Sequence, residues 1–239
     1  MALFFALIVF LFGLAVGSFL NCVIYRLEKN KSFLKGRSFC PNCRHKLSWQ
    51  DLIPIFSFLF LKGKCRYCQK NISFQYPVVE LATGILFVLC FLFHAPYYLF
   101  IIIPFLVVIF VYDLKHCLIP DKVIYPAILI ALIFNFTNWL SALSAAAFFL
   151  TIVLISRGRW MGIGDISLGF LMGLLLGFPN ILLSLFLAFA IGAIIGLGLI
   201  AAGKKSLKSE VPFGPFLIAA TLIAIFWGEK IINWYLNLL

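Results

Sequence analysis

Charged residues are scarce in this sequence, and acidic residues are the scarcest. Of 239 residues only 11% are charged, with 8 Asp and Glu against 19 Lys and Arg, while 64% are hydrophobic. A soluble domain is about a quarter charged. The alternating strands of an outer-membrane barrel are also lacking. These absences exclude an ordinary soluble enzyme and predict an all-α polytopic integral membrane protein.

Three other signals are missing. Residues 1–25 carry no basic segment ahead of their apolar run, so they indicate a first membrane span and not a cleaved signal peptide. No Rossmann glycine fingerprint is present. The net charge of +11 does not indicate a nucleic-acid-binding surface, because 11 of the 19 basic residues lie between Arg26 and Lys70, in one predicted cytoplasmic loop. We therefore expect the lipid bilayer as a partner, and no nucleic acid.

Basic residues recur in alternate loops between the apolar runs. The first loop carries most of them, and the third, fifth and seventh carry pairs or triplets that include Lys204, Lys205 and Lys208. The positive-inside rule then places the odd loops in the cytoplasm and both termini outside. The pattern predicts about eight spans, roughly at 2–25, 77–94, 97–114, 122–139, 141–156, 164–178, 180–202 and 211–228. We expect three parts: a first helix (1–25), a cytoplasmic loop (26–76) and a membrane core of about seven helices (77–239).

The cytoplasmic loop contains two CxxC motifs. CPNC (Cys40, Cys43) and CRYC (Cys65, Cys68) are separated by 21 residues, a spacing typical of a four-thiolate zinc site. Four protein ligands leave no open position, so the predicted role of zinc is structural, and the metal would supply folding energy that this short loop lacks. The alternative is a pair of redox motifs or disulfides, which a cytoplasmic location disfavours.

Of the acids inside or at the ends of the predicted spans, four could have a special role. Glu80 falls within the second span, and Asp113, Asp121 and Asp165 fall at cytoplasmic span ends. Asp121 follows Pro120, so it is a natural N-cap, and Asp165 could also be a simple cap. Asp113 is different, because an acid at a helix C-terminus opposes the helix macrodipole.

A close pair of carboxylates would have a different meaning. Two such acids share one proton at neutral pH, which is the basis of aspartyl proteolysis. Gly162 and Gly164, which precede Asp165, would let a substrate backbone or a neighbouring helix come close. The residues alone leave both interpretations open, separate caps or a catalytic pair.

Six motifs in order give the chain a family resemblance over nearly its whole length. It resembles the bacterial type IV prepilin peptidases, the bifunctional leader peptidase/N-methyltransferases of the GxGD type. The motifs are GSFLNCVIYRL (Gly17–Leu27), the zinc loop CPNC and CRYC with WQDLIPIFSFLFLKG between them, QYPVVELATGILF (Gln75–Phe87), the D-x7-D arrangement (Asp113–Asp121), GIGD (Gly162–Asp165) and VPFGPFL (Val211–Leu217).

The resemblance implies a membrane aspartyl endopeptidase with Asp113 and Asp165 as the catalytic pair and Asp121 in a supporting role. It implies prepilin or pseudopilin substrates, cut behind a basic leader at the cytoplasmic face of the bacterial inner membrane. It also implies methylation of the new N-terminus with S-adenosylmethionine as donor. Glu80 matches a family acid, for which we hypothesise a role in substrate or methyl-donor handling, with an interhelical hydrogen bond as the alternative. Ser167 departs from the family's usual Lys.

Two other functions fit parts of the sequence. The acids could be proton or cation sites of a small membrane transporter with a regulatory zinc loop, although no inverted repeat is evident. The two CxxC pairs could serve a membrane thiol oxidoreductase. Neither alternative accounts for all six motifs.

Overall fold

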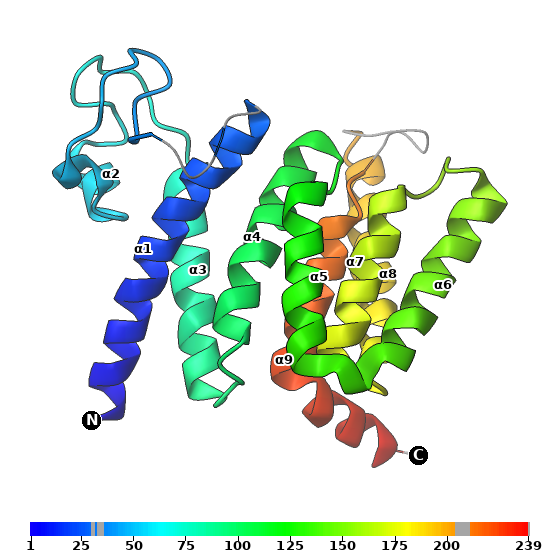
Figure 1. The fold of residues 1–239 in the computed structure, drawn as a ribbon. Coiled ribbons are helices and arrows are strands. Elements are labelled where there is room, and N and C mark those ends of the chain that lie inside the picture. Colours follow the sequence, from blue (N-terminus) through cyan, green and yellow to red (C-terminus); the bar gives the residue numbers. More distant parts are fainter. Residues whose placement is uncertain (30–31, 33–35, 204–210, 239) are drawn as a thin grey trace. The chain divides into compact units, whose positions relative to one another are not determined.

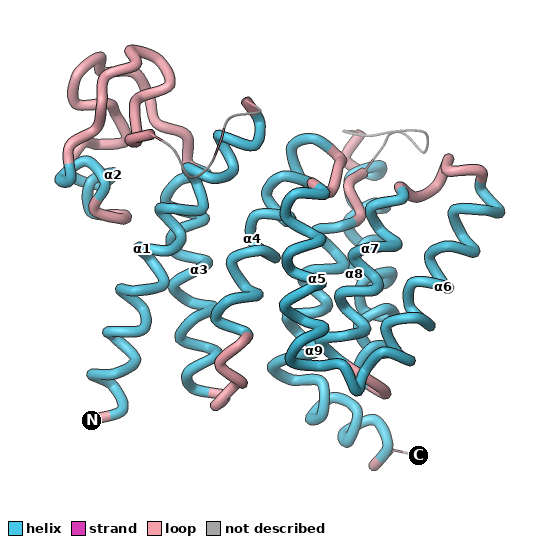
Figure 2. Tube along the Cα trace, viewed as in Figure 1, coloured by secondary structure: helices cyan, strands magenta, loops and turns pink. Residues whose placement is uncertain are grey.

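The computed structural model describes residues 1–29, 32, 36–203 and 211–238. Lys204, Lys205 and Lys208 of the predicted seventh loop lie outside these residues. The described chain forms helices and no strand, apart from two isolated bridges in the cysteine-rich loop, as Figure 2 shows. The prediction of an all-helical protein is confirmed. The α-helices are α1 (Ala2–Glu28), α2 (Phe56–Phe60), α3 (Gln75–Leu92), α4 (Leu99–His116), α5 (Asp121–Asn135), α6 (Trp139–Ser156), α7 (Ile163–Leu176), α8 (Asn180–Ala201) and α9 (Gly214–Leu236), drawn in Figure 1.

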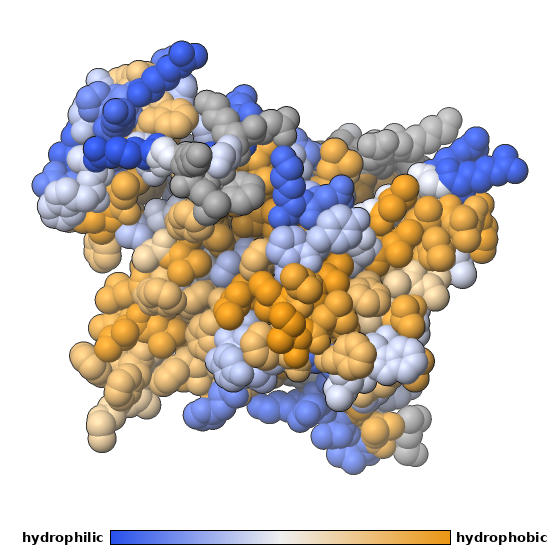
Figure 3. Space-filling model, viewed as in Figure 1, coloured by the Kyte–Doolittle hydropathy of each residue, from blue (hydrophilic) through white to orange (hydrophobic). Residues whose placement is uncertain are grey.

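The apolar helices fit a multi-pass membrane protein, but they do not confirm the count of eight spans. Within the described residues, six stretches are long and apolar enough to cross a membrane. One of them, Asp121–Ser156, holds both α5 and α6, which run in opposite directions on either side of a 3-10 turn (Figure 1). Helix α7 has only 14 residues, about 21 Å against a hydrocarbon core of about 30 Å. In Figure 3 hydrophobic surface covers the helices, and hydrophilic surface gathers at their ends and on the loops.

The chain divides into two compact units, Met1–Val108 and Ile109–Leu239. In the first unit, α1 and α3 pack along their length through glycines. A Cβ atom added to Gly13 would lie 2.8 Å from the Cα of Gly84, and one added to Gly17 would lie 2.7 Å from the Cα of Glu80. Small residues spaced by four let two membrane helices approach until their backbones touch. The Asn21 side chain then donates a hydrogen bond of 3.0 Å to the carbonyl of Tyr76.

In the second unit, α7 is the central helix and packs on α5, α6, α8 and α9. Its closest neighbour is α6, because Gly173 leaves room for the α6 backbone. A Cβ atom at Gly173 would lie 2.6 Å from both the nitrogen of Ala142 and the carbonyl oxygen of Ser141. The Ser141 hydroxyl donates to the Gly173 carbonyl at 2.7 Å, and Asn138 Nδ2 donates to the Leu174 carbonyl at 2.9 Å. The Asn138 bond satisfies a carbonyl in the last turn of α7, where intrahelical donors run out, whereas the Gly173 carbonyl also accepts from the N–H of Gly177 at 3.1 Å.

The glycine contact between α6 and α7 can be tested with a matched pair of alanine substitutions. We expect Gly173→Ala to lower the free energy of unfolding by about 1–3 kcal/mol, because the added methyl group meets backbone atoms that cannot move independently. Gly196→Ala on α8 is the control, since nothing lies within 4 Å of its added Cβ atom. That variant should be neutral or gain up to about 1 kcal/mol from helix propensity. The measurement is the unfolding midpoint of purified protein in detergent, and equal midpoints for the two variants would contradict the packing argument.

Candidate active site and metal centre

Asp113 lies in the last turn of α4, where its own helix dipole is unfavourable for a negative charge. The structure shows what offsets this. Oδ2 of Asp113 accepts a hydrogen bond of 3.0 Å from the backbone N–H of Gly214, the first residue of α9. The carboxylate therefore faces the positive end of a second helix. A Cβ atom at Gly214 would lie 2.6 Å from this same oxygen, so a side chain there would displace the carboxylate.

Asp165 is the third residue of α7 and is buried like Asp113, with exposed fractions of 8% and 4%. Its Oδ2 accepts a hydrogen bond of 3.1 Å from the N–H of Gly162, one of the donors that the start of α7 leaves unpaired. This is a capping contact, so the simpler interpretation of Asp165 is partly correct. The second oxygen of each carboxylate accepts no hydrogen bond from any residue that the structure describes.

The fold brings the two aspartates together. Asp113 lies close enough to Asp165 for the two carboxylates to repel each other when both are ionised. The contact of α9 with α7 makes this possible, since the first residue of α9, Gly214, bonds to Asp113, and Asp165 lies in the first turn of α7. The two buried acids each have one oxygen fixed by a backbone N–H, and no hydrogen bond joins their carboxylates in the described structure. They are near enough for the charge of one to disfavour ionisation of the other.

The two glycines before Asp165 have different surroundings. A Cβ atom at Gly164 would lie 2.9 Å from Cβ of Ile119, so this glycine admits the segment that leads into α5. At Gly162 the nearest atoms to an added Cβ are 3.9 Å away, one of them an oxygen of Asp165, which is an ordinary van der Waals contact, so no neighbour excludes a side chain there. The expectation that glycines here permit close approach is therefore met by Gly164.

Asp121 does not take the position that the sequence suggested. Helix α5 begins at Asp121 itself, with Pro120 as the N-cap residue, and no side-chain capping bond is formed. The expectation of an Asp121 N-cap is therefore wrong. The side chain is exposed in the first turn of α5, where a negative charge is favourable to the helix dipole without a specific bond.

Glu80 belongs to the first unit and has a structural partner that the sequence did not reveal. It is 6% exposed, and its Oε2 accepts a hydrogen bond of 2.7 Å from the backbone N–H of Ile55 in the cysteine-rich loop. The Ser18 side chain on α1 also lies near this carboxylate. Ile55 has φ +60° and ψ −52°, a conformation that β-branched residues very rarely adopt. No local pattern predicts such a pairing, because it depends on a strained turn 25 residues away in the sequence.

The four cysteines meet as predicted. The Sγ atoms of Cys40, Cys43, Cys65 and Cys68 all lie within 4.8 Å of one another, and those of Cys40 and Cys68 are 3.9 Å apart. Tetrahedral zinc with Zn–S bonds of about 2.3 Å places its sulfurs about 3.8 Å apart, so the residues fit this metal. All four thiols are free, which excludes disulfides in this structure.

The two knuckles have the same backbone geometry. In each, the first Cys donates its N–H to the carbonyl five residues on and accepts from the N–H four residues on. The residue after the second Cys has positive φ in both, +58° at Arg44 and +57° at Gln69. All four bonds are 2.9 Å long: Cys40 to His45, Arg44 to Cys40, Cys65 to Lys70 and Gln69 to Cys65.

The pKa values of the cluster thiols also favour binding of a cation. Burial acts to raise the pKa of Cys40, but hydrogen bonds from the backbone of Cys43 and Asn42 and from neighbouring thiols lower it to about 7. At Cys68 a backbone hydrogen bond from Lys70 lowers the pKa, but burial and the other thiols together raise it to about 11. One thiolate is thus stabilised by the remaining thiol protons, and a bound cation would take over that stabilisation.

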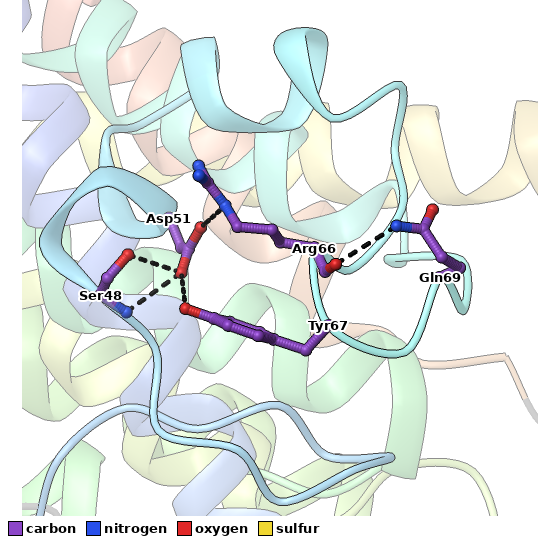
Figure 4. A network of polar contacts seen from close by, with 5 residues as sticks. All are labelled: Ser48, Asp51, Arg66, Tyr67 and Gln69. Carbon is purple, nitrogen blue, oxygen red and sulfur yellow. Dashed lines mark hydrogen bonds and ion pairs between the residues drawn. The ribbon is translucent and has the colours of Figure 1, made fainter.

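A polar network around Asp51 joins the second knuckle to the segment between the knuckles (Figure 4). Asp51 accepts from Ser48 Oγ at 2.8 Å, from Tyr67 Oη at 3.2 Å and from Arg66 Nε at 2.8 Å. Burial acts to raise the pKa of Asp51, but the Ser48 bonds, the Arg66 charge and Tyr67 together lower it. The His45 ring stacks on Tyr67 with centroids 3.7 Å apart, which ties the first knuckle to the same network.

The fold and the site define a class of protein: an all-helical membrane protein with two buried aspartates and a four-cysteine cluster. Comparison with known proteins points to a family of this class. A model of the type IV leader peptidase family matches residues 100–197, which include both aspartates, and a model of the bacterial peptidase A24 N-terminal domain matches residues 11–94.

Full-length relatives carry one name, prepilin leader peptidase/N-methyltransferase. The Bacillus subtilis protein is 34% identical over 242 residues, which cover 97% of this chain and 98% of the relative. The Legionella pneumophila protein is 35% identical over 275 residues (98% and 95%), and that of Aeromonas salmonicida is 33% identical over 276 residues (98% and 94%). No solved structure matches the chain. The chain belongs to the type IV leader peptidase family, which confirms the resemblance and does not favour a transporter.

The metal prediction can be tested on purified protein. We expect one zinc ion per chain, and we expect Cys40→Ser or strong chelation to release it and to expose the loop to proteolysis, because the thiolates hold the loop together. Cys117→Ser is the control, since Cys117 is exposed and lies outside the cluster. Zinc is measured by elemental analysis and loop opening by limited proteolysis. Metal-free protein with a protease-resistant loop would contradict the prediction.

Proposed function

We propose that this chain is a membrane aspartyl endopeptidase that removes the leader from type IV prepilins and pseudopilins, with Asp113 and Asp165 as its catalytic pair. The observation that supports the proposal is the presence of two buried carboxylates near each other, one in the last turn of α4 and one in the first turn of α7. The names of the full-length relatives support the substrate class. Pilus assembly, protein secretion and competence all use such precursors, and each is a candidate context.

The proposed chemistry uses one proton shared by the pair. The ionised aspartate takes a proton from water, and the water oxygen bonds to the carbonyl carbon of the scissile peptide. The protonated aspartate gives its proton to the carbonyl oxygen, which produces a neutral tetrahedral intermediate. When this intermediate collapses, the C–N bond breaks and the leaving amine takes a proton from the protonated aspartate. One hydroxyl of the intermediate gives its proton to the ionised aspartate as the new carboxyl group forms, so the pair ends with one shared proton again. No covalent enzyme intermediate forms.

Backbone donors position the pair for these steps. The N–H groups of Gly214 and Gly162 each hold one carboxylate oxygen, which leaves the second oxygen of each acid for water and substrate. Gly162 has no Cβ atom, so a substrate backbone could approach the carboxylate of Asp165 closely there. Asp121 and Gly164 act in support, Gly164 by admitting Ile119 against α7. We keep a role for Glu80 in substrate or methyl-donor handling as a hypothesis.

The second proposed activity is methylation of the new N-terminal amine. S-adenosylmethionine would supply the methyl group: the bond between its sulfur and the methyl carbon would break, S-adenosylhomocysteine would leave, and the amine would lose one proton as the C–N bond forms. The support is the name shared by the relatives. We assign no residue to the methyl-donor site.

We further propose that the enzyme lies in the bacterial inner membrane with the cysteine loop and both aspartates in or at the cytoplasm and both termini outside. The basic loops support this sidedness. The division into a first helix (1–25), a zinc loop (26–76) and a protease core (77–239) belongs to the same proposal.

The catalytic pair predicts the result of two conservative substitutions. Asp113→Asn and Asp165→Asn should each lower cleavage by about a thousandfold or more, since either change removes the shared proton chemistry. Asp121→Asn is the control and should retain most activity. The measurement is mass spectrometry of the N-terminus of a co-expressed prepilin, which also detects an added methyl group. Complete cleavage by either variant, when it is inserted at wild-type levels, would refute the dyad.

A second variant tests the position of Asp113 without changing its charge. Gly214→Ala places a methyl group against the carboxylate, so we expect cleavage to fall by about 10- to 100-fold, as for a displacement near 1 Å. The same change at Gly196, where nothing lies within 4 Å, should leave cleavage at the wild-type rate. Wild-type rates for Gly214→Ala in a single-turnover assay would show that the N-terminus of α9 does not position Asp113.

A further inference from the structure

The segment between the two cysteine knuckles has an unusual surface for a loop in water. Helix α2 turns Phe56, Leu59 and Phe60 outward, with exposed fractions of 52%, 64% and 84%. Its inward side holds Phe58, whose ring covers Gly63 and lies 5.5 Å from the ring of Phe74. Other apolar side chains in and beside this segment are also exposed: Trp49, Leu52, Ile53 and Phe74. Contiguous apolar surface of this kind marks a contact with a protein or a membrane.

The depth of α2 is set by its bond to α3. The amide of Ile55, directly before α2, donates to Glu80, and α3 as a whole, Gln75–Leu92, is apolar and long enough to span a membrane. Glu80 lies five residues inside α3, which is about 7–8 Å below the start of that helix. The first residues of α2 therefore lie at the level of a membrane-spanning segment. In Figure 1, α2 lies beside the upper part of α1, below the knuckles.

The backbone at Ile55, where the chain turns towards α3, has a strained conformation. The N–H of Phe56 donates to the carbonyl of Pro54 at 2.6 Å, which closes a tight γ-turn with positive φ at Ile55. This turn is rare because it crowds a branched side chain. The γ-turn points the Ile55 N–H at Glu80. The hydrogen bond to Glu80 in turn stabilises the strained backbone conformation of Ile55.

Positive charge follows the apolar surface directly. Lys62 and Lys64 are exposed and come two and four residues after the end of α2. Apolar side chains followed by lysines are the pattern of segments that lie in the interface of a membrane with anionic lipids, where the side chains enter the acyl region and the ammonium groups meet the phosphates.

We infer that α2 and its exposed neighbours are embedded in the cytoplasmic leaflet of an anionic bilayer, with the Ile55–Glu80 hydrogen bond as the anchor. The loop that carries the metal site then rests on the membrane surface, continuous with the lipid-facing sides of α1 and α3. This inference does not depend on the proposed peptidase activity, so each can fail without the other.

Photo-crosslinking in vesicles tests the placement of α2. The photoreactive residue p-benzoylphenylalanine replaces Phe60 in one sample and Lys46, an exposed residue after the first knuckle, in the matched control. The full-length protein is reconstituted in phosphatidylcholine vesicles containing phosphatidylglycerol and checked for metal content. We expect lipid adducts by mass spectrometry at position 60 and not at position 46. A second label at Phe56 covers the case in which the first variant does not fold.

Three outcomes would overturn the inference. Equal lipid adducts at positions 46 and 60 would mean that the loop is not ordered on the membrane. Adducts at position 60 only with residues 109–239 of the same chain would mean that the protein itself covers α2. Adducts only with a second copy would mean that α2 is an interface between chains.

Two further arms test the anchor and the charges. Glu80→Ala should lower the yield of lipid adduct at position 60, whereas Glu80→Gln keeps an acceptor for the Ile55 N–H and should preserve it. Lys62→Gln and Lys64→Gln should each lower the ratio of embedded to free loop by about fivefold in anionic vesicles. Unchanged yields in Glu80→Ala would overturn the role of Glu80 as the anchor, and unchanged yields in the lysine variants would overturn the role of the anionic lipid.

Discussion

In lipid, two helices gain little by burying apolar side chains against each other, because the surrounding acyl chains are equally apolar. Close backbone approach must supply the attraction, and glycine permits it. Both units depend on this constraint. Gly13 and Gly17 bring α1 against Gly84 and Glu80 of α3, and Gly173 brings α7 against the backbone of α6. These contacts position the helix ends, and the chemistry of the protein is carried by groups at those ends.

Buried carboxylates are the second consequence of an apolar surrounding. A carboxylate away from water needs donors, and a helix N-terminus has backbone N–H groups without partners. Asp113 uses Gly214 at the start of α9, and Asp165 uses Gly162 at the start of α7. Each acid thereby satisfies a helix end that the membrane would leave unpaired. The same bonds fix the carboxylate orientations, so the atoms that stabilise the helix ends also position the proposed catalytic pair.

The cysteine loop meets a different constraint, since it is too short to bury a core. The four-cysteine cluster and the Asp51 network hold its polar part together. On α2, Phe58 packs inward, whereas Phe56 and Phe60 are not needed inside and face outward. An exposed apolar surface of this kind would promote aggregation of a soluble domain. A loop tethered between two membrane helices can instead place that surface in lipid. Metal binding and membrane contact are, in this view, two parts of one solution for a small loop.

Much of this protein could be derived from residue order. Helical class, the four-cysteine cluster and family membership follow from composition, spacing and motif order, because these depend on local periodicity and on ligand types at short separation. The count of eight spans is not confirmed, since α7 is shorter than the membrane is thick. The capping role assigned to Asp121 was also wrong, since helix ends depend on neighbouring contacts to within a residue or two.

Only the tertiary structure decided which groups meet. The sequence places Gly214 101 residues beyond Asp113, and nothing in either local pattern indicates that the first amide of α9 would hold that carboxylate. The sequence likewise indicated Glu80 as a candidate functional acid. In the fold, its carboxylate accepts a hydrogen bond from the backbone N–H of Ile55. Long-range hydrogen bonds of this kind arise from helix packing, which brings helix ends together irrespective of their separation along the chain. The sequence by itself therefore determined which chemical groups the protein possesses, and the packing of its helices decided which of them act together.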